Sequence, residues 1–182
     1  MPKYKFKRKA LTTHEEIASM IKKAKEPWLK AIIAFLYVFG CRISEALAMQ
    51  KEDVWIERDT LCVNIPLLKR RKTKGPYERP AHILRVKINT PFIDEFIKYW
   101  EELPPYKKIF PHSRWWTWKK IKETNKKISP HVFRHDRLTK IAMKKPNPFL
   151  LKEWAGWSDT RPAESYVEAV GFLTNELQDI IE

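Results

Sequence analysis

The chain has 182 residues, a length that suits one packed domain and is short for two. A hydrophobic content of 43% argues against disorder, and a formal net charge of +14 makes nucleic acid the leading partner. With two cysteines, no signal-type segment and no apolar run long enough to cross a bilayer, the sequence excludes membrane and disulfide-rich secreted proteins, so a reducing, cytoplasmic setting is expected.

The first part of the chain predicts a basic arm followed by helices. Residues 1–11 form the arm, and Thr13 with Glu16 fits a capping box that opens the first helix. Two further helices are expected over residues 27–39 and 43–49.

Apolar residues then predict a small antiparallel sheet. Leu61, Val63 and Ile65 alternate along one strand, and Ile83, Val86 and Ile88 lie on the next. The segment between these strands, residues 69–80, is basic and broken by Gly75-Pro76, which is typical of a hairpin loop.

Proline and capping signatures divide the rest of the chain into helices. Thr90 before Pro91 predicts one helix start, and Ser129 before Pro130 predicts another. Helices are expected at about residues 91–100, 115–121, 130–143 and 148–155, around Tyr166, and at 172–181. The fold class is therefore mainly α with a small antiparallel sheet (α+β), a helical bundle flanked by a β-hairpin sheet.

Three separated motifs carry charged and nucleophilic side chains. They are Arg42-Ile43-Ser44-Glu45, then His131-Val132-Phe133-Arg134-His135, and then Gly156-Trp157 with Tyr166 nine residues after the tryptophan. This order resembles the catalytic domain of the tyrosine recombinases, the phage-type integrases, as an archaeal or viral-like member. The resemblance runs from about residue 11 to residue 170 and thus covers nearly the whole chain.

The resemblance implies a site-specific recombinase, or integrase, of double-stranded DNA. Such an enzyme cleaves and rejoins strands through a 3′-phosphotyrosine, without a metal or nucleotide cofactor. Self-association as a dimer or tetramer on DNA is implied as well, with a monomeric free state left open. No membrane partner is expected, and the resemblance implies a prokaryotic or archaeal host cell.

By the same resemblance, Arg42 and Arg134 bind the scissile phosphate, for which each guanidinium offers a planar, charged fork. Tyr166 corresponds to the nucleophile, and clustered cations are expected to lower the pKa of its phenol. His131 corresponds to a histidine that donates to the phosphate and is able to accept a proton. Trp157 stands where the family has His or Trp, and its indole can only donate.

Two further residues fall in supporting positions. Glu45 matches an acidic residue that orients the active site, although a surface salt bridge on the helix explains it nearly as well. His135 forms an i, i+4 pair with His131, and since no Glu or Cys completes a ligand set, no metal site is expected.

The leaving 5′-oxygen needs a proton, which the family supplies from a lysine in the sheet hairpin. Lys72, followed by Thr73, fits the usual Lys-Thr pattern best, with Lys74 second and Lys69 as a further alternative. Without the resemblance, this segment is typical of a solvated basic loop that contacts phosphates.

Family members usually carry a DNA-clamping domain ahead of the catalytic domain. Residues 1–11 are too few for one, so we expect an arm at 1–11, the catalytic domain at 12–182 and no clamping domain. No Lys or Arg follows Arg161, so the acidic C-terminal helix is expected to dock on a neighbouring protomer or on its own domain. Two other functions stay open: a type IB topoisomerase-like relaxation of DNA, and a non-catalytic DNA-binding module.

Overall fold

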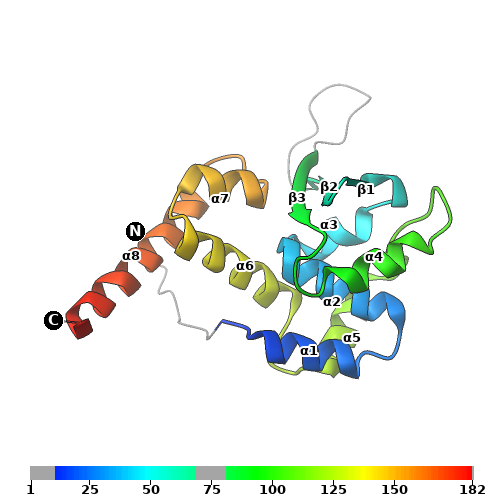
Figure 1. The fold of residues 1–182 in the computed structure, drawn as a ribbon, viewed down its shortest axis with the longest axis horizontal. Helices are drawn as coiled ribbons and strands as arrows, with labels where there is room; N and C mark the ends of the chain where they lie inside the picture. The colour runs from blue at the N-terminus through cyan, green and yellow to red at the C-terminus, as the bar shows by residue number, and fades with distance from the viewer. Residues whose placement is uncertain (1–10, 69–80, 182) are drawn as a thin grey trace.

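Eight α-helices and one three-stranded sheet make up residues 11–68 and 81–181, which the computed structural model describes. In chain order the elements are α1 (His14–Lys23), α2 (Pro27–Phe39), α3 (Ile43–Ala48), the short 3-10 turn η1 (Lys51–Asp53), β1 (Val54–Glu57), β2 (Thr60–Pro66), β3 (Ala81–Lys87), α4 (Ile93–Glu101), α5 (Arg114–Thr124), α6 (Pro130–Lys144), α7 (Pro148–Ala155) and α8 (Arg161–Ile181). Figure 1 shows α6 in the middle, between α7 and α8 on one side and the remaining helices with the sheet on the other. This arrangement confirms the predicted α+β fold class.

The sheet is antiparallel in the order β1-β2-β3. The two predicted strands pair with each other, with Ile65 opposite His82. The sequence reading missed β1, because in a strand of four residues only Val54 is buried and no alternation develops. The predicted hairpin loop, residues 69–80, lies outside the described residues.

Helix α2 is the centre of the larger hydrophobic core. Every residue from Ala31 to Phe39 is buried, since α1, α4, α5 and α6 all pack against this helix. Within this core, Phe35 lies with its ring centroid 4.7 Å from those of Phe39 and Phe96. A helix that is apolar on every side must be enclosed, which explains why the other elements surround it.

A second, smaller core joins α6, α7 and α8. Its buried residues are Leu138, Ala142, Leu151, Ala155, Ala163 and Val170. Helix α6 belongs to both cores, because Phe133 packs in the larger core and Leu138 in the smaller one. The helix that carries Tyr166 is therefore anchored through α6.

Backbone carbonyls at the C-terminus of α2 join the two halves of the molecule, one built around the larger core and the other around the smaller core. The helix ends at Gly40 in the left-handed region (φ 63°), where a side chain would come within 2.7 Å of the Arg137 Cβ atom. Trp154 Nε1 donates to the Phe39 carbonyl at 2.9 Å, and Arg134 Nη1 donates to the Gly40 carbonyl at 3.0 Å. Carbonyls that have no partner within their helix are thus capped by side chains of α6 and α7.

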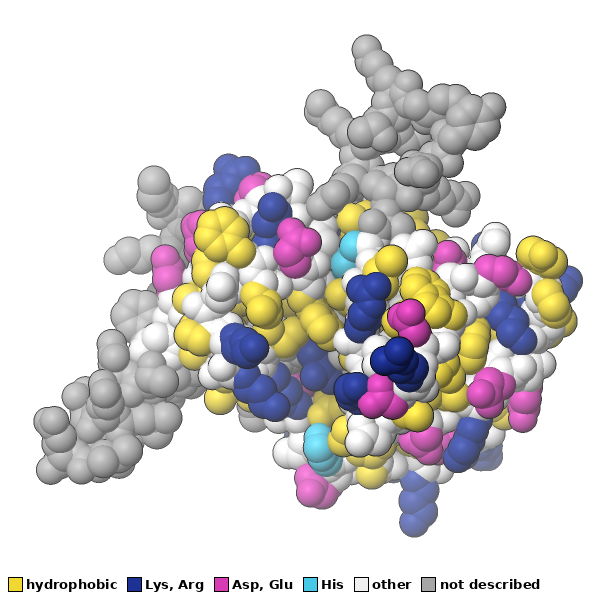
Figure 2. Space-filling model, turned by 45° about the horizontal axis from the view of Figure 1, so that its top comes forward, with side chains coloured by type: hydrophobic (Ala, Val, Ile, Leu, Met, Phe, Trp, Pro, Cys, Tyr) yellow, Lys and Arg dark blue, Asp and Glu magenta, His cyan; other side chains and the backbone are white. Residues whose placement is uncertain are grey.

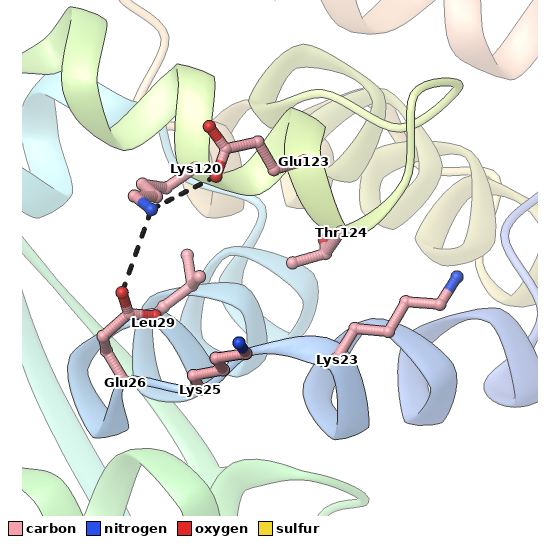
Figure 3. A pocket seen from close by; sticks show the side chains of 7 residues that line it. All are labelled: Lys23, Lys25, Glu26, Leu29, Lys120, Glu123 and Thr124. Atoms are coloured by element: carbon pink, nitrogen blue, oxygen red, sulfur yellow. Dashed lines mark ion pairs between the residues drawn. The ribbon is translucent and has the colours of Figure 1, made fainter.

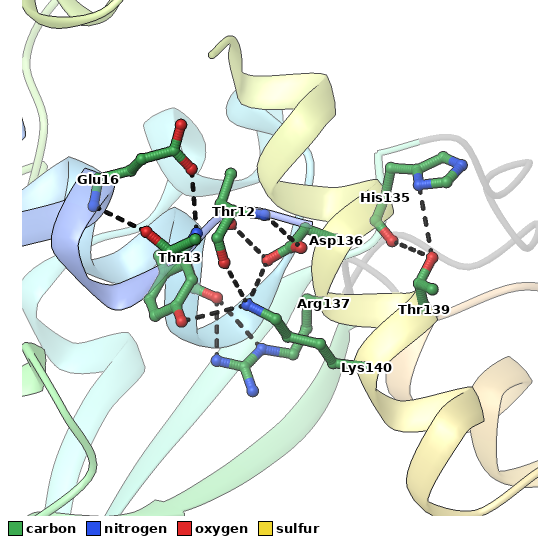
Figure 4. Close-up of polar contacts among 9 residues, drawn as sticks. Thr12, Thr13, Glu16, His135, Asp136, Arg137, Thr139 and Lys140 are labelled. Atoms are coloured by element: carbon green, nitrogen blue, oxygen red, sulfur yellow. Dashed lines mark hydrogen bonds and ion pairs between the residues drawn. The ribbon is translucent and has the colours of Figure 1, made fainter. Parts of the chain in front are cut away.

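A buried polar network ties residue 12 to α6 (Figure 4). The carboxylate of Asp136 is 3% exposed and accepts hydrogen bonds from the backbone N–H of Thr12 at 3.1 Å and from its hydroxyl at 2.6 Å. Lys140 pairs with the same carboxylate at 2.8 Å and also donates to the Thr12 carbonyl at 2.9 Å. A buried charge with this many partners should be costly to disrupt.

We therefore expect Asp136→Ala to lower the free energy of unfolding by about 3 kcal/mol, because Lys140 and both Thr12 donors lose their acceptor. Asp94→Ala is the matched control, since Asp94 pairs with Lys98 at 3.4 Å on the exposed surface and should change stability by less than ~0.5 kcal/mol. Urea unfolding followed by circular dichroism measures both. Similar small changes in the two variants would contradict the assigned role of the network.

Two predicted helix boundaries were wrong. The Thr90-Pro91 signature does not start α4, because Thr90 and Pro91 lie in a turn after β3 and Phe92, in the left-handed region (φ 71°), precedes the helix. The two helices predicted at the C-terminus are one, since α8 continues through Gly171. A single glycine lowers helix propensity by only about 1 kcal/mol and does not force a break. No helix in the described part of the chain is long and apolar enough to span a membrane.

Candidate active site

The first arginine motif is held at the start of α3 by a buried carboxylate. Glu45 is 1% exposed and accepts from Arg42 Nη1 at 2.6 Å and from the Arg42 backbone N–H at 2.8 Å. The side chain of Arg42 keeps an exposed fraction of 21%. Because Glu45 holds both the backbone and the side chain of Arg42, the rest of this guanidinium is presented to solvent in a fixed orientation.

Arg134 is the second arginine and is buried between the two halves. Its Nη1 donates to the Gly40 carbonyl and its Nη2 donates to the Ala155 carbonyl, both at 3.0 Å. Burial lowers the pKa of the Arg134 guanidinium, and the positive charge of Arg42 lowers it further. Since an arginine keeps its proton in proteins, the two cations remain close to each other and would both gain from an anion placed between them.

The turn after α7 carries Trp157 and is fixed by side chains from other elements. Arg134 Nη2 caps the Ala155 carbonyl, and His82 Nε2 of β3 donates to the Trp154 carbonyl at 3.2 Å. Gly156 lies in the left-handed region (φ 65°), and a Cβ atom there would be 2.9 Å from the His82 ring. The indole of Trp157 lies beside the Arg134 guanidinium, with 5.6 Å from the ring centroid to Cζ.

His82 is a residue of this site that the sequence reading missed. It lies outside the three motifs, and its contact with α7 joins residues 72 positions apart. A pattern of neighbouring residues in the sequence cannot indicate a contact between positions so far apart. Because the carbonyl of Trp154 can only accept, Nε2 of His82 must carry the proton of this hydrogen bond.

Tyr166 on α8 is half-buried against two rings. Its centroid lies 5.3 Å from that of His135 and 5.9 Å from that of Trp157. Burial raises the pKa of the phenol, while the charge of Arg134 lowers it by less. The expected lowering of this pKa by cations is therefore wrong for the protein alone, because loss of solvation outweighs the attraction to Arg134.

The two histidines of α6 occupy different environments. His131, on the first turn, is exposed, whereas His135, one turn later, is half-buried against Tyr166. The structure thus brings together Arg42 with Glu45, and Arg134 with Trp157, His135 and Tyr166. Lys69, Lys72 and Lys74 lie outside the described residues.

Other surfaces contain less specific chemistry. Figure 3 shows a pocket between α5 and the turn from α1 to α2, where Lys120 pairs with Glu123 at 3.2 Å and with Glu26 at 3.9 Å. None of the candidate site residues lines it.

Within residues 11–68 and 81–181, no cluster of three or more His, Cys, Asp or Glu side chains could hold a metal ion. Figure 2 shows Lys and Arg side chains in the middle of one face, interleaved with Asp and Glu.

Comparison with known proteins identifies the class. The chain belongs to the phage integrase family, whose model matches residues 10–170, so the resemblance carried by the three motifs is confirmed. Tyrosine recombinase XerA of Pyrococcus horikoshii is 24% identical over 93% of this chain, and a probable integrase/recombinase of Aquifex aeolicus is 29% identical over 80%. This chain spans 59% and 54% of the length of these two proteins.

Solved structures show the same fold. A XerA recombinase matches with a TM-score of 0.66 and 16% identity. The match covers 88% of this chain and 61% of the XerA chain. The XerH site-specific recombinase bound to its difH substrate also has a TM-score of 0.66, with 20% identity over 84% of this chain and 47% of its own. The catalytic domain of the bacteriophage HP1 integrase, at a TM-score of 0.59 and 14% identity, is covered over 88% of both chains. The fold is thus that of the tyrosine recombinase catalytic domain.

Proposed function

We propose that this chain is the catalytic domain of a site-specific recombinase that cleaves and rejoins double-stranded DNA through a 3′-phosphotyrosine on Tyr166. The observation that carries the proposal is the position of Tyr166 beside Arg134, which in turn lies close enough to Arg42 for their charges to interact. A phenol next to paired guanidinium groups suits attack on a phosphodiester.

In this mechanism the scissile phosphate lies between Arg42 and Arg134, whose charges stabilise the pentacoordinate transition state. Tyr166 attacks phosphorus, and the 5′-oxygen leaves. The indole N–H of Trp157 and the exposed ring of His131 supply further donors to the phosphate oxygens. Since cations of the protein neutralise the developing charge, the chemistry requires no metal or nucleotide cofactor.

The net charge of +14 supports DNA as the partner, because Lys and Arg displace counterions from the phosphate backbone. A DNA substrate agrees with the cytoplasmic location expected from the sequence. We further propose that the protein self-associates on DNA and that the acidic C-terminal segment, 172–182, docks on a basic surface of a neighbouring copy or of its own domain. Light scattering on DNA with two sites, with and without this segment, measures its part in assembly.

The proposed chemistry is tested with a nicked suicide substrate, in which loss of a short strand traps the cleaved state. We expect a covalent protein–DNA adduct that forms at the same rate with and without a chelator, because arginines bear the phosphate charge. An adduct that forms only after a divalent ion is restored would reject the metal-free mechanism, and absence of any adduct on the cognate site would reject the function.

The proton for the leaving oxygen is proposed to come from Lys72. We expect Lys72→Ala to slow cleavage of an ordinary substrate at least ~100-fold, and a substrate with a 5′-bridging phosphorothiolate far less, because sulfur leaves without an acid. Single-turnover rates on both substrates measure the difference. Equal slowing on both would exclude Lys72 as the acid, and the same comparison then applies to Lys74 and Lys69.

A second function is supported by an exposed aromatic and basic surface on α5. Trp115, Trp116 and Trp118 have exposed fractions of 64%, 38% and 46%. Lys119 and Lys120 lie 5.2 and 5.0 Å from the centroids of neighbouring indoles. Such a surface would bind DNA whether or not cleavage occurs. A trapped adduct excludes the non-catalytic module, and recombination of paired sites without relaxation of a supercoiled plasmid excludes the topoisomerase.

A further inference from the structure

The histidine nearest the proposed nucleophile is the second histidine of the α6 motif. The rings of His135 and Tyr166 are tilted by 50° with centroids 5.3 Å apart, a separation at which the ring edges touch. His131 is exposed on the first turn of the same helix. The geometry thus separates the two imidazoles, with His135 beside the phenol and His131 on the exposed surface of the helix.

The contacts of Thr139 favour one of the two tautomers of His135. The hydroxyl of Thr139 lies 2.9 Å from the His135 carbonyl, to which its single proton is donated. The same hydroxyl oxygen lies 3.4 Å from His135 Nδ1 and can therefore only accept there. This long hydrogen bond favours the tautomer with the proton on Nδ1, which leaves the lone pair of the ring on Nε2.

We propose that His135 is a catalytic residue that accepts the phenol proton of Tyr166 through Nε2, with Thr139 as the positioning residue that sets the tautomer. The inference rests on the proposed function and deepens it. A base whose second nitrogen is fixed by a hydroxyl group follows the general arrangement of an activated nucleophile, in which a third group orients the base.

The step balances as follows. The phenol oxygen of Tyr166 gives an electron pair to phosphorus and forms the new P–O bond, while its proton passes to His135 Nε2. The bond between phosphorus and the 5′-oxygen breaks, and its electron pair stays on that oxygen, which takes a proton from the lysine acid. When the strand is rejoined, the imidazolium of His135 returns the proton to the phenol.

Burial supports the need for such a base. The pKa of the Tyr166 phenol is raised by loss of solvation, and the charge of Arg134 only partly offsets this. The phenol of the resting protein is therefore neutral near pH 7, and a partner must take its proton as the phosphorus bond forms.

The test compares His135→Asn with the wild-type protein on the suicide substrate under single-turnover conditions. Asparagine keeps a donor near the Nδ1 position and lacks the acceptor at Nε2, so a residue that only packs or donates to Thr139 would lose little. We expect a loss of about 100-fold, in the range of general base catalysis. Thr139→Val should give a smaller loss, because the tautomer is no longer fixed while the imidazole remains.

A second nucleophile separates proton transfer from folding. When 3,5-difluorotyrosine replaces Tyr166, the acidified phenol ionises without a base, so His135→Asn should then slow cleavage less than ~5-fold. A variant that is misfolded or binds DNA poorly would slow both nucleophiles alike, and that result would overturn the proposal. His131→Asn is the matched control and should slow both nucleophiles equally, since it acts on the phosphate.

The experiment distinguishes an error in the proposed function from an error in the role assigned to His135. If the wild-type protein forms no adduct on its cognate site, the proposed function itself is wrong. If the wild-type protein forms the adduct and His135→Asn cleaves at the wild-type rate, the function stands and the role of His135 is wrong. Selective rescue of His131→Asn by difluorotyrosine would assign the base to His131 and likewise overturn the inference.

Discussion

Tyr166→Phe is expected to abolish the covalent DNA adduct, with cleavage reduced at least ~1,000-fold, while DNA affinity stays within about twofold. Phenylalanine keeps the ring that packs beside His135 and Trp157 and lacks only the attacking oxygen. A single neutral hydroxyl contributes little to affinity beside many phosphate contacts. Gel separation of the trapped adduct and a parallel DNA-binding titration measure the two quantities.

The exposed Tyr106→Phe is a suitable control for the loss of one hydroxyl, because Tyr106 is 83% exposed and outside the candidate site. It should form the adduct at the wild-type rate. Persistence of the adduct in Tyr166→Phe would identify a different nucleophile and remove the central residue of the proposed mechanism.

Arg134→Lys is expected to reduce cleavage by ~100- to 1,000-fold although the positive charge is retained. The guanidinium reaches the Gly40 and Ala155 carbonyls simultaneously, and a lysine ammonium on a flexible stem cannot span both and still face a phosphate. One carbonyl would be left buried without its donor, so the free energy of unfolding should fall by about 1 to 3 kcal/mol as well. Single-turnover cleavage and urea unfolding measure the two effects.

Arg137→Lys is the matched control on the same helix. Arg137 is partly buried and donates through Nε and Nη2, but both bonds go to the Tyr37 carbonyl, away from Tyr166. This variant should lose stability and retain cleavage by the folded fraction. If Arg134→Lys lost no more cleavage than Arg137→Lys, the effect would be one of stability, and Arg134 would have no separate role at the phosphate.

Local signals in the sequence predicted much of the fold. The helices expected at residues 27–39 and 148–155 end as predicted, each followed by a glycine in the left-handed region, Gly40 or Gly156, and Pro130 begins α6. These features depend on neighbouring residues alone, so a single sequence contains them. The left-handed conformation of Phe92 could not be predicted from the neighbouring residues, because it depends on packing against the larger core.

The contacts of the candidate site that lie within one sequence motif could be predicted from the sequence. Arg42 and Glu45 are one helical turn apart, and their contact follows from that spacing. The contacts of His82 and Trp154 were missed because they cross the fold: His82 donates to the last turn of α7, and Trp154 donates to the end of α2. The pKa of Tyr166 was also misjudged, since the extent of burial is a property of the assembled structure.

The hydrogen bonds that join the two halves of the molecule constrain its sequence mainly at the donor residues. Arg134, Trp154, His82 and Arg137 all donate to backbone carbonyls, an acceptor that every amino acid supplies. Substitutions at acceptor positions such as Phe39 or Ala155 leave these bonds unchanged as long as the backbone keeps its path. Selection on these hydrogen bonds therefore acts on a few donors and on the two glycines that shape the chain, whereas the side chains at the acceptor positions are constrained by packing in the two cores.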